Sequence, residues 1–486
     1  MKIRLLAIFL LLATATAFAA CPDATNNAGY VLPSSAGGDG STWSTSGTHA
    51  AFSSNPSTPV RGCTYYYATG SYGTWAIPQI SGTSVITIQP ATVANHGTAT
   101  GWSSSYAGLV QWNEWDFNGS NASYYTFNGV AGGGPPDWAC TNCLIKMNVG
   151  SGTVACGLCI SAGTISNITL NHVNIAGPGI SACGANDSCD LIYFCSSGCS
   201  GTYSNWLIEY SYLHDTTRTM LLTFPNPGTG MTIDHSYFAR NGTAEHREAW
   251  SMSTDSNVVI SNNIWEDICE SGVIAAVNGA GTASNWQVYG NLFEWTGAAG
   301  AGCIINTGVL VIAHSNCPTA QCINTSGWLV YDNVIANVPS GSFLSAFDFE
   351  NITGAISCEN NIWYNNDSSA GPGPSGCGFS NSGSQVADYN WFYGNTPTND
   401  TSGPHDVVGS AIPFQTSSNP NFPNGNWELA SQIAGVSLGS PYNVDMLGNG
   451  PLAGVFSRGA LQFGSSSPVV TSPAGLNALR ELGIIR

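Results

Sequence analysis

The chain has 486 residues, of which only 8% are charged, and its 28 acidic side chains against 10 Lys and Arg give a formal net charge of −18. Such an acidic surface repels nucleic acid and anionic lipid, so we expect neither as a partner. With 43% hydrophobic and 11% aromatic residues, the chain is also too apolar to be disordered, despite its many Gly, Ser, Thr and Asn.

Residues 1–20 are predicted to form a secretory signal peptide. The stretch MKIRLLAIFLLLATATAFAA has two early cations, an apolar run and small residues at its end. It is too short for a membrane anchor, and no later stretch is apolar enough to span a bilayer. We therefore expect an exported protein, secreted or held at the cell surface. Its mature chain is still more acidic, because Lys2 and Arg4 are removed.

Cys21 follows the predicted cleavage site directly, so a lipid anchor on this residue is one alternative to a disulfide. Phe18 is an unusual residue three positions before a lipidated Cys. All 16 cysteines lie after the signal peptide, which is an even set if Cys21 keeps its thiol. We therefore favour a disulfide-bonded Cys21 over a lipidated one.

Two short motifs, CTNC at 140–143 and CGLC at 156–159, have the cysteine spacing of a zinc ribbon as well as that of disulfides. Disulfides are the expected state of cysteines in an exported chain. We therefore favour disulfides at both motifs, and loops stapled in the same way along the Cys-rich run that follows. That run contains Cys183, Cys189, Cys195 and Cys199.

From residue 206 the sequence repeats a short pattern, in which a run of β-branched or aromatic residues is followed by a polar turn and a large apolar residue. The copies occupy 206–215, 231–240, 258–267, 286–295, 328–337 and 356–365. Successive turns lie roughly 25 to 29 residues apart, except where residues 297–327 insert an extra excursion. The aligned turn positions hold Ser211, Ser236, Asn263, Asn291, Asn333, Asn361 and Asn390.

This repeat predicts a parallel β-helix, an all-β solenoid in which each short coil stacks on the next. The residue before the turn is Asn262, Gly290, Asp332 or Asn360 on four copies, and these types tolerate a left-handed backbone at low cost. An Asn at the same turn of every coil can hydrogen-bond its copies above and below. The blades of a β-propeller repeat with a longer period. A β-sandwich does not stack equivalent turns, so it would not require Asn at the same position of successive repeats.

Both ends of the chain resemble bacterial secreted right-handed parallel β-helix repeat proteins of the pectate-lyase-like superfamily. The resemblance rests on YVLPSSAGGDGSTWS and VITIQPATVANHGTATGW near the N-terminus, and on NPNFPNGNWELASQ and GSPYNVDMLGNGPLAGVFSRGALQF near the C-terminus. It implies one right-handed β-helix, a fold that serves many functions, and the disulfides expected in an exported chain would staple its loops. We expect an entry segment and first coils over 21–135, coils with Cys-rich loops over 136–400, and a closing coil and tail over 401–486.

The few cations of the chain gather between residues 215 and 270. Because parallel strands stack in register, residues at equal repeat positions become neighbours about 5 Å apart. One such row, which begins with charges of alternating sign, holds Asp215, Arg240, Asp267, Trp295 and Asn337. A second row holds Arg218, His246, Arg247 and Glu270. We expect one compact patch drawn from three coils.

The family resemblance implies a polysaccharide lyase, which cleaves an acidic polymer by β-elimination. That reaction needs a group that neutralises the uronate carboxylate, a base that removes the adjacent proton, and an acid that assists the leaving oxygen. His246 or Arg247 could be the base. Arg218 and Arg240 could neutralise the carboxylate in bidentate fashion.

Acidic and aromatic side chains beside these cations complete the predicted site. Carboxylate oxygens are ligands that Ca²⁺ prefers, and indole rings offer faces for sugar rings. The candidate Ca²⁺ ligands are Asp215, Asp267 and Glu270, and the candidate substrate contacts are Glu248, Trp250 and Trp295. We expect polysaccharide as the partner and no cofactor other than Ca²⁺.

Two departures from the family pattern keep a second interpretation open. Lyases of this fold often use Lys, whereas the mature chain has only Lys146, and the TIDH stretch at 232–235 lacks the arginine motif that should follow it. The alternative is a non-catalytic structural or adhesive β-helix, a coat, stalk or filament that could self-associate. An enzyme should hold the patch in a groove with few saturated ion pairs, whereas a structural protein should pair every charge.

Overall fold

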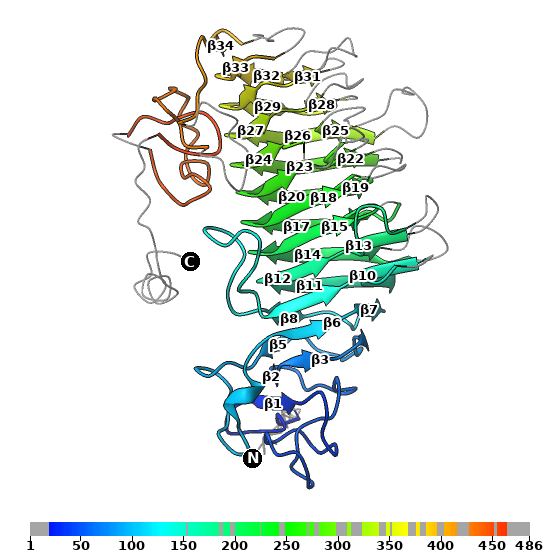
Figure 1. Ribbon diagram of the computed structural model, residues 1–486. Coiled ribbons are helices and arrows are strands. Elements are labelled where there is room, and N and C mark those ends of the chain that lie inside the picture. Colours follow the sequence, from blue (N-terminus) through cyan, green and yellow to red (C-terminus); the bar gives the residue numbers. More distant parts are fainter. Residues whose placement is uncertain are drawn as a thin grey trace, which may run out of the picture.

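Three long parallel sheets form the protein, and Figure 1 shows them as the stacked coils of a right-handed parallel β-helix. This computed structural model describes residues 19–463, with gaps at 152–153, 184–187, 195–199, 224, 243–247, 270–271, 277–280, 298–308, 313–322, 340–346, 350–351, 368–375, 380–384, 396–402, 416–426 and 452–453. Within these bounds there is one short 3-10 helix, η1 (Ser104–Tyr106), and no helix that could cross a membrane. The predicted fold class is confirmed.

Each sheet takes at most one strand from each coil. Sheet A consists of β1 (Ala28–Val31), β2 (Thr64–Tyr67), β5 (Ile86–Pro90), β8 (Tyr125–Asn128), β11 (Thr164–Asn171), β14 (Thr202–Glu209), β17 (Thr229–Asp234), β20 (Ser256–Ser261), β23 (Gly281–Tyr289), β26 (Ile323–Tyr331), β29 (Ile356–Glu359) and β32 (Gln385–Asp388). Sheet B consists of β3 (Gly70–Ser71), β6 (Val110–Trp112), β9 (Ile145–Asn148), β12 (Val173–Ala176), β15 (Tyr212–Thr216), β18 (Tyr237–Asn241), β21 (Ile264–Glu266), β24 (Leu292–Glu294), β27 (Val334–Ala336), β30 (Ile362–Tyr364), β33 (Trp391–Tyr393) and β34 (Val407–Val408). Sheet C consists of β4 (Thr74–Ala76), β7 (Glu114–Asn118), β10 (Val154–Ala162), β13 (Ser188–Phe194), β16 (Leu221–Leu222), β19 (Trp250–Met252), β22 (Ile274–Ala276), β25 (Leu310–Ile312), β28 (Phe347–Phe349) and β31 (Cys377–Phe379).

A continuous apolar core runs along the inside of the stack. Because successive strand residues point to opposite faces, the middle residue of a three-residue strand enters the core while its neighbours point outward. Trp265 of β21 and Phe293 of β24 show this, since both are fully buried and their rings stack at 6.0 Å. Each coil alone would leave such rings in water, so the coils are stable only when stacked.

The predicted asparagine ladder is present at the turn between sheets A and B. The backbone N–H and the Nδ2 of Asn263 both donate to Oδ1 of Asn291 at 3.0 Å, and the same pair of bonds joins Asn291 to Asn333. The residue before each turn is left-handed, with φ of 57° at Asn262 and 54° at Asp332, as expected. The ladder therefore satisfies buried backbone groups that no strand can reach.

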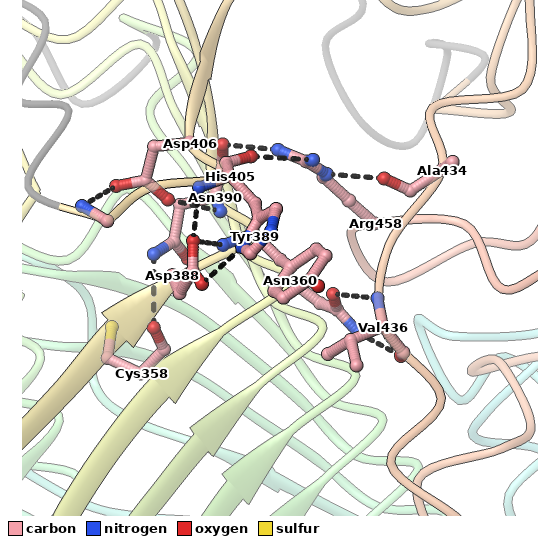
Figure 2. A network of polar contacts seen from close by, with 11 residues as sticks. Cys358, Asn360, Asp388, Tyr389, Asn390, His405, Asp406, Ala434, Val436 and Arg458 are labelled. Atoms are coloured by element: carbon pink, nitrogen blue, oxygen red, sulfur yellow. Dashed lines mark hydrogen bonds and ion pairs between the residues drawn. The ribbon is translucent and has the colours of Figure 1, made fainter.

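Figure 2 shows how the ladder ends at the C-terminal side of the stack. The backbone N–H of Asn390, on the last rung, donates to Oδ1 of Asp406 at 2.7 Å. The buried guanidinium of Arg458 donates to the backbone carbonyls of His405 at 3.0 Å and Ala434 at 2.8 Å. Terminal coils of a solenoid need such capping, because their backbone groups have no further coil to pair with.

Disulfides close the loops, as predicted for an exported chain. The bridges join Cys21 to Cys63, Cys140 to Cys143, Cys156 to Cys159, Cys183 to Cys189 and Cys358 to Cys377. Both short motifs are thus disulfides and not a zinc ribbon. Cys21 lies in a bridge, which agrees with the expectation that its thiol is not lipidated. The predicted insertion at 297–327 falls mainly outside the described residues.

Two segments from outside the coils cover part of the outer face of sheet B. Trp138 and the Cys140–Cys143 bridge belong to an apolar cluster with the outward residues Tyr212 and Tyr237. The same cluster includes residues of the C-terminal segment, such as Trp427, and Figure 1 shows that segment in orange beside the stack. This covering buries the centre of the face.

Candidate functional site

Arg240 is the centre of a charged cluster on the outer side of sheet B, which we call the Arg240 site. Its Nε donates to Oδ1 of Asp215 at 2.6 Å, and one Nη donates to Oδ2 of Asp215 at 3.0 Å and to the Tyr212 hydroxyl at 2.7 Å. The other Nη lies 3.5 Å from Oε1 of Glu266. Asp215, Arg240 and Glu266 come from β15, β18 and β21, three successive coils.

The two carboxyl groups of the Arg240 site have opposite protonation tendencies. Burial raises the pKa of Glu266 to about 7, against the hydrogen bond with Tyr237. Burial also disfavours the ionised form of Asp215, but hydrogen bonds with His214 and Arg240 outweigh it and hold the pKa of Asp215 well below its usual range. Near neutral pH the site therefore pairs an ionised Asp215 with a Glu266 that is substantially protonated.

Aromatic rings hold these charged groups in place. The ring of Tyr212 stacks at 3.9 Å on His214 and at 4.7 Å on Tyr237. His214 contacts Oδ2 of Asp215 through Nδ1 at 2.6 Å and Oδ1 of Asn174 through Nε2 at 3.1 Å. Burial lowers the pKa of His214, so the ring is neutral at pH 7. The most exposed side chain of the group is Asp215, at 35%.

A second cluster surrounds Arg218, where the chain enters sheet C. One Nη of Arg218 lies 3.6 Å from Oδ2 of Asp190, whose Oδ1 accepts from the N–H of Thr219 at 3.1 Å. The register of β13, β16 and β19 places Asp190, Thr219 and Glu248 in one row, and both acids are fully buried. Burial raises the pKa of Asp190 to about 6, although Arg218 opposes the shift.

Asp190 should make stability depend on pH in a defined direction. Its folded-state pKa of about 6 lies above the value of 3.8 for an exposed Asp, so its stabilising effect is fully present below pH 4 and is lost as pH rises through 6. We expect the unfolding free energy of the parent, relative to Asp190→Asn, to fall by about 2 kcal/mol between pH 4 and 7. Urea unfolding of both proteins at each pH measures this difference, and a difference that grows with pH would contradict the assignment.

The predicted residues meet in part. The register of β15, β18 and β21 aligns Asp215, Arg240 and Asp267 as expected. Asp267 is fully buried, however, and its carboxylate accepts from the N–H and the hydroxyl of Thr296 at 2.8 and 2.5 Å. Glu266, one residue earlier, is the acid that faces Arg240. His246, Arg247 and Glu270 lie outside the described residues, so their roles stay predictions.

Two predicted sugar contacts need correction. Trp250 is 0% exposed and packs on Trp286, and Trp295 is 4% exposed and donates to the carbonyl of Ile268 at 2.7 Å. Both indoles belong to the core, where no sugar ring can reach them, because inward and outward positions alternate along the strand. Glu248 is also fully buried, so it lies beneath the surface rather than on it.

The described acids do not by themselves make a metal site. No group of three or more His, Cys, Asp and Glu side chains in this part of the chain is placed to hold a metal ion. Asp215 is engaged by Arg240 and His214, and Asp267 by Thr296. Calcium binding therefore stays a prediction that depends on Glu270.

Sequence reasoning missed the residues that complete both clusters. They are Asp190, Tyr212, His214, Tyr237 and Glu266. Four of them occupy outward positions of sheet B strands, and strict alternation from the buried Leu213, Phe238 and Trp265 could have found them. Asp190 lies in the Cys-rich run before residue 206, where no recognisable repeat copy allows its position to be aligned with those of later coils.

Comparisons with known proteins show distant structural likenesses. No protein-family model and no curated protein matches the chain. The catalytic unit of a thermostable GH87 alpha-1,3-glucanase from Streptomyces thermodiastaticus strain HF3-3 is 14% identical over 72% of this chain, with a TM-score of 0.28. PfbA, a surface adhesin of Streptococcus pneumoniae, is 9% identical over 71% of this chain and 83% of its own, with a TM-score of 0.30. The match spans 65% of the glucanase chain, less than two thirds of its length.

Proposed function

We propose that the Arg240 site binds and cleaves an extracellular polysaccharide by hydrolysis, with Glu266 as the proton donor. The observation that carries this proposal is the pair of carboxyl groups on either side of one guanidinium, one ionised and one protonated near pH 7. Glycoside hydrolysis needs such a pair, an acid for the leaving oxygen and a base for water. Asp215 and Glu266 lie two strands apart, a backbone separation of about 10 Å.

The residues have defined roles in this reaction. Glu266 gives its proton to the glycosidic oxygen as the bond to the sugar carbon breaks, and Asp215 accepts a proton from the water that adds to that carbon. Proton exchange with solvent then returns a proton to Glu266 and removes the proton from Asp215. Glu266 is 5% exposed, and its buried Oε2 has no hydrogen-bond partner among the described groups, so no contact within the protein engages a proton on this oxygen. Arg240 fixes both carboxyl groups and stays charged throughout.

The predicted β-elimination of an acidic polymer is the second candidate chemistry. It needs a cation to neutralise a uronate carboxylate, yet Arg240 already contacts Asp215 and Glu266, and Arg218 faces Asp190. These contacts favour a neutral substrate. Elimination would instead depend on His246, Arg247 and bound Ca²⁺. The test therefore includes acidic polymers and Ca²⁺.

A panel of soluble neutral and acidic polysaccharides separates the candidates. We expect new reducing ends on a neutral polymer without the ultraviolet absorbance of an unsaturated product, and no dependence on Ca²⁺. Absorbance that develops on pectate, alginate or a glycosaminoglycan would establish elimination instead. Neither signal on any polymer would overturn cleavage and favour the structural or adhesive alternative.

A further inference from the structure

The outer face of sheet A carries a row of threonines on four successive coils near its N-terminal end. Thr64, Thr87, Thr126 and Thr169 are aligned by the register of β2, β5, β8 and β11. Their spacing is the distance between parallel strands, about 4.8 Å. All four are half-buried, and their hydroxyls have no hydrogen-bond partner in the described chain. The row thus presents hydroxyls at a regular repeat to the outside.

A second row runs beside the threonines, two residues further along each strand. It holds Tyr66, Gln89, Asn128 and Asn171. Residues two apart on a strand share a face, so both rows lie on the same side of the sheet. Oδ1 of Asn128 accepts from the N–H of Val130, which leaves its Nδ2 as a donor, whereas Oδ1 of Asn171 is buried, so the acceptors of this face are the threonine hydroxyls. The face therefore offers both donors and acceptors.

Aromatic rings extend this face beyond Tyr66. Tyr66, Trp102 and Tyr106 are half-buried against the apolar cluster of the N-terminal coils. Trp102 stacks on His96 at 4.0 Å with the two rings nearly parallel, and the Tyr66 hydroxyl donates to Oδ1 of Asn95 at 2.8 Å. Half-exposed rings next to hydroxyls and amides are the combination that sugars need, because a sugar ring has apolar faces and polar edges.

The charge of the face selects the class of ligand. Neither row contains a carboxylate or a cation on these four coils, in a chain with a net charge of −18. The next two coils place Glu209 and Asp234 in the second row, in register with Asn171. An acidic polymer that extended along the rows would be repelled by these carboxylates, whereas an uncharged one would not be.

We propose that this face, the two rows with Trp102 and Tyr106, is a binding surface for an extended neutral polysaccharide that lies along the stack. Regularly spaced hydroxyls and amides fit the repeated hydroxyls of such a polymer, and the aromatic rings hold one end. The surface lies on sheet A, whereas the Arg240 site lies on sheet B. It binds whether or not that site cleaves, and it would hold the protein on an insoluble polymer.

Retention on insoluble polysaccharides tests the proposal. The probes are microcrystalline cellulose, chitin and insoluble β-1,3-glucan, with calcium pectate gel as the acidic comparison. We expect the parent to be retained on at least one neutral polymer and not on pectate. The double variant Thr87→Val, Thr126→Val keeps the β-branched shape and should lose about tenfold in affinity, since it removes two hydroxyls from the row.

Matched variants make the result decisive. Thr282→Val changes an outward threonine of β23, on a distant coil of the same sheet, and should bind like the parent. Reducing ends released from a soluble polymer are measured on the same proteins, so failure of cleavage at the Arg240 site and failure of binding at this face are distinguishable. The proposal is overturned if the parent is retained on none of the neutral polymers, if it is retained equally on pectate, or if the double variant binds as tightly as the parent.

Discussion

Replacing Glu266 with Gln is expected to lower the rate of polysaccharide cleavage by at least about a hundredfold, the usual contribution of a general acid. Gln keeps the size of the side chain and its polar contact near Arg240, but it has no acidic proton to give to the glycosidic oxygen. Initial rates of reducing-end formation on the polymer that the parent cleaves best measure the effect. A variant that retains most of the parent rate would exclude Glu266 as the proton donor.

The pH dependence of the parent gives an independent check on the same residue. Burial raises the pKa of Glu266 to about 7, and only its protonated form is active, so the rate should decline as pH rises through 7. Asp215, whose pKa is held low, should impose no decline near neutral pH. The matched control is Asp234→Asn on β17, where the carboxylate accepts from the Ser261 hydroxyl at 2.6 Å on another sheet. This variant should keep the parent rate.

The fold was predictable because its strongest constraint recurs at one position of every coil. Asn263, Asn291 and Asn333 each satisfy backbone groups of neighbouring coils, so the same residue type returns at the same turn. The residue before the turn, such as Asn262, has a left-handed backbone, so residue types that tolerate this conformation also recur there in the sequence. Parallel stacking then places Asp215 beside Arg240 without further information.

The chemistry of the site was less predictable because it turns on single-residue differences. Glu266 and Asp267 are adjacent in the sequence, but Glu266 faces Arg240, while Asp267 is fully buried and its carboxylate accepts from Thr296. The same alternation buries Trp250. The pKa of Asp190 depends on burial by elements far away in the chain, which no local pattern records.

Replacing Asn291 with Leu should destabilise the protein by about 3–5 kcal/mol, because it leaves several buried polar groups without partners. Oδ1 of Asn291 accepts two bonds from Asn263 at 3.0 Å, and its Nδ2 donates to the carbonyl of Ile260 at 2.9 Å. Leucine fills a similar volume but makes none of these bonds. Urea unfolding at pH 7 measures the loss of unfolding free energy.

The matched control is Asn324→Leu, an outward, half-buried Asn of β26 with no side-chain hydrogen bond in the described chain. It should change the unfolding free energy by less than about 0.5 kcal/mol. Equal losses in the two variants would mean that the ladder adds nothing beyond the burial of an amide.

Because each coil contacts only its neighbours, a broken rung also weakens one interface of the stack more than any other. We therefore expect the parent to unfold in one transition and Asn291→Leu in two, since the coils on either side of that rung then unfold with less coupling. If Asn291→Leu instead unfolds in one transition at a lower urea concentration, the aromatic core and not the ladder couples the coils. That core crosses the same interface through the stacked rings of Trp286 and Trp328.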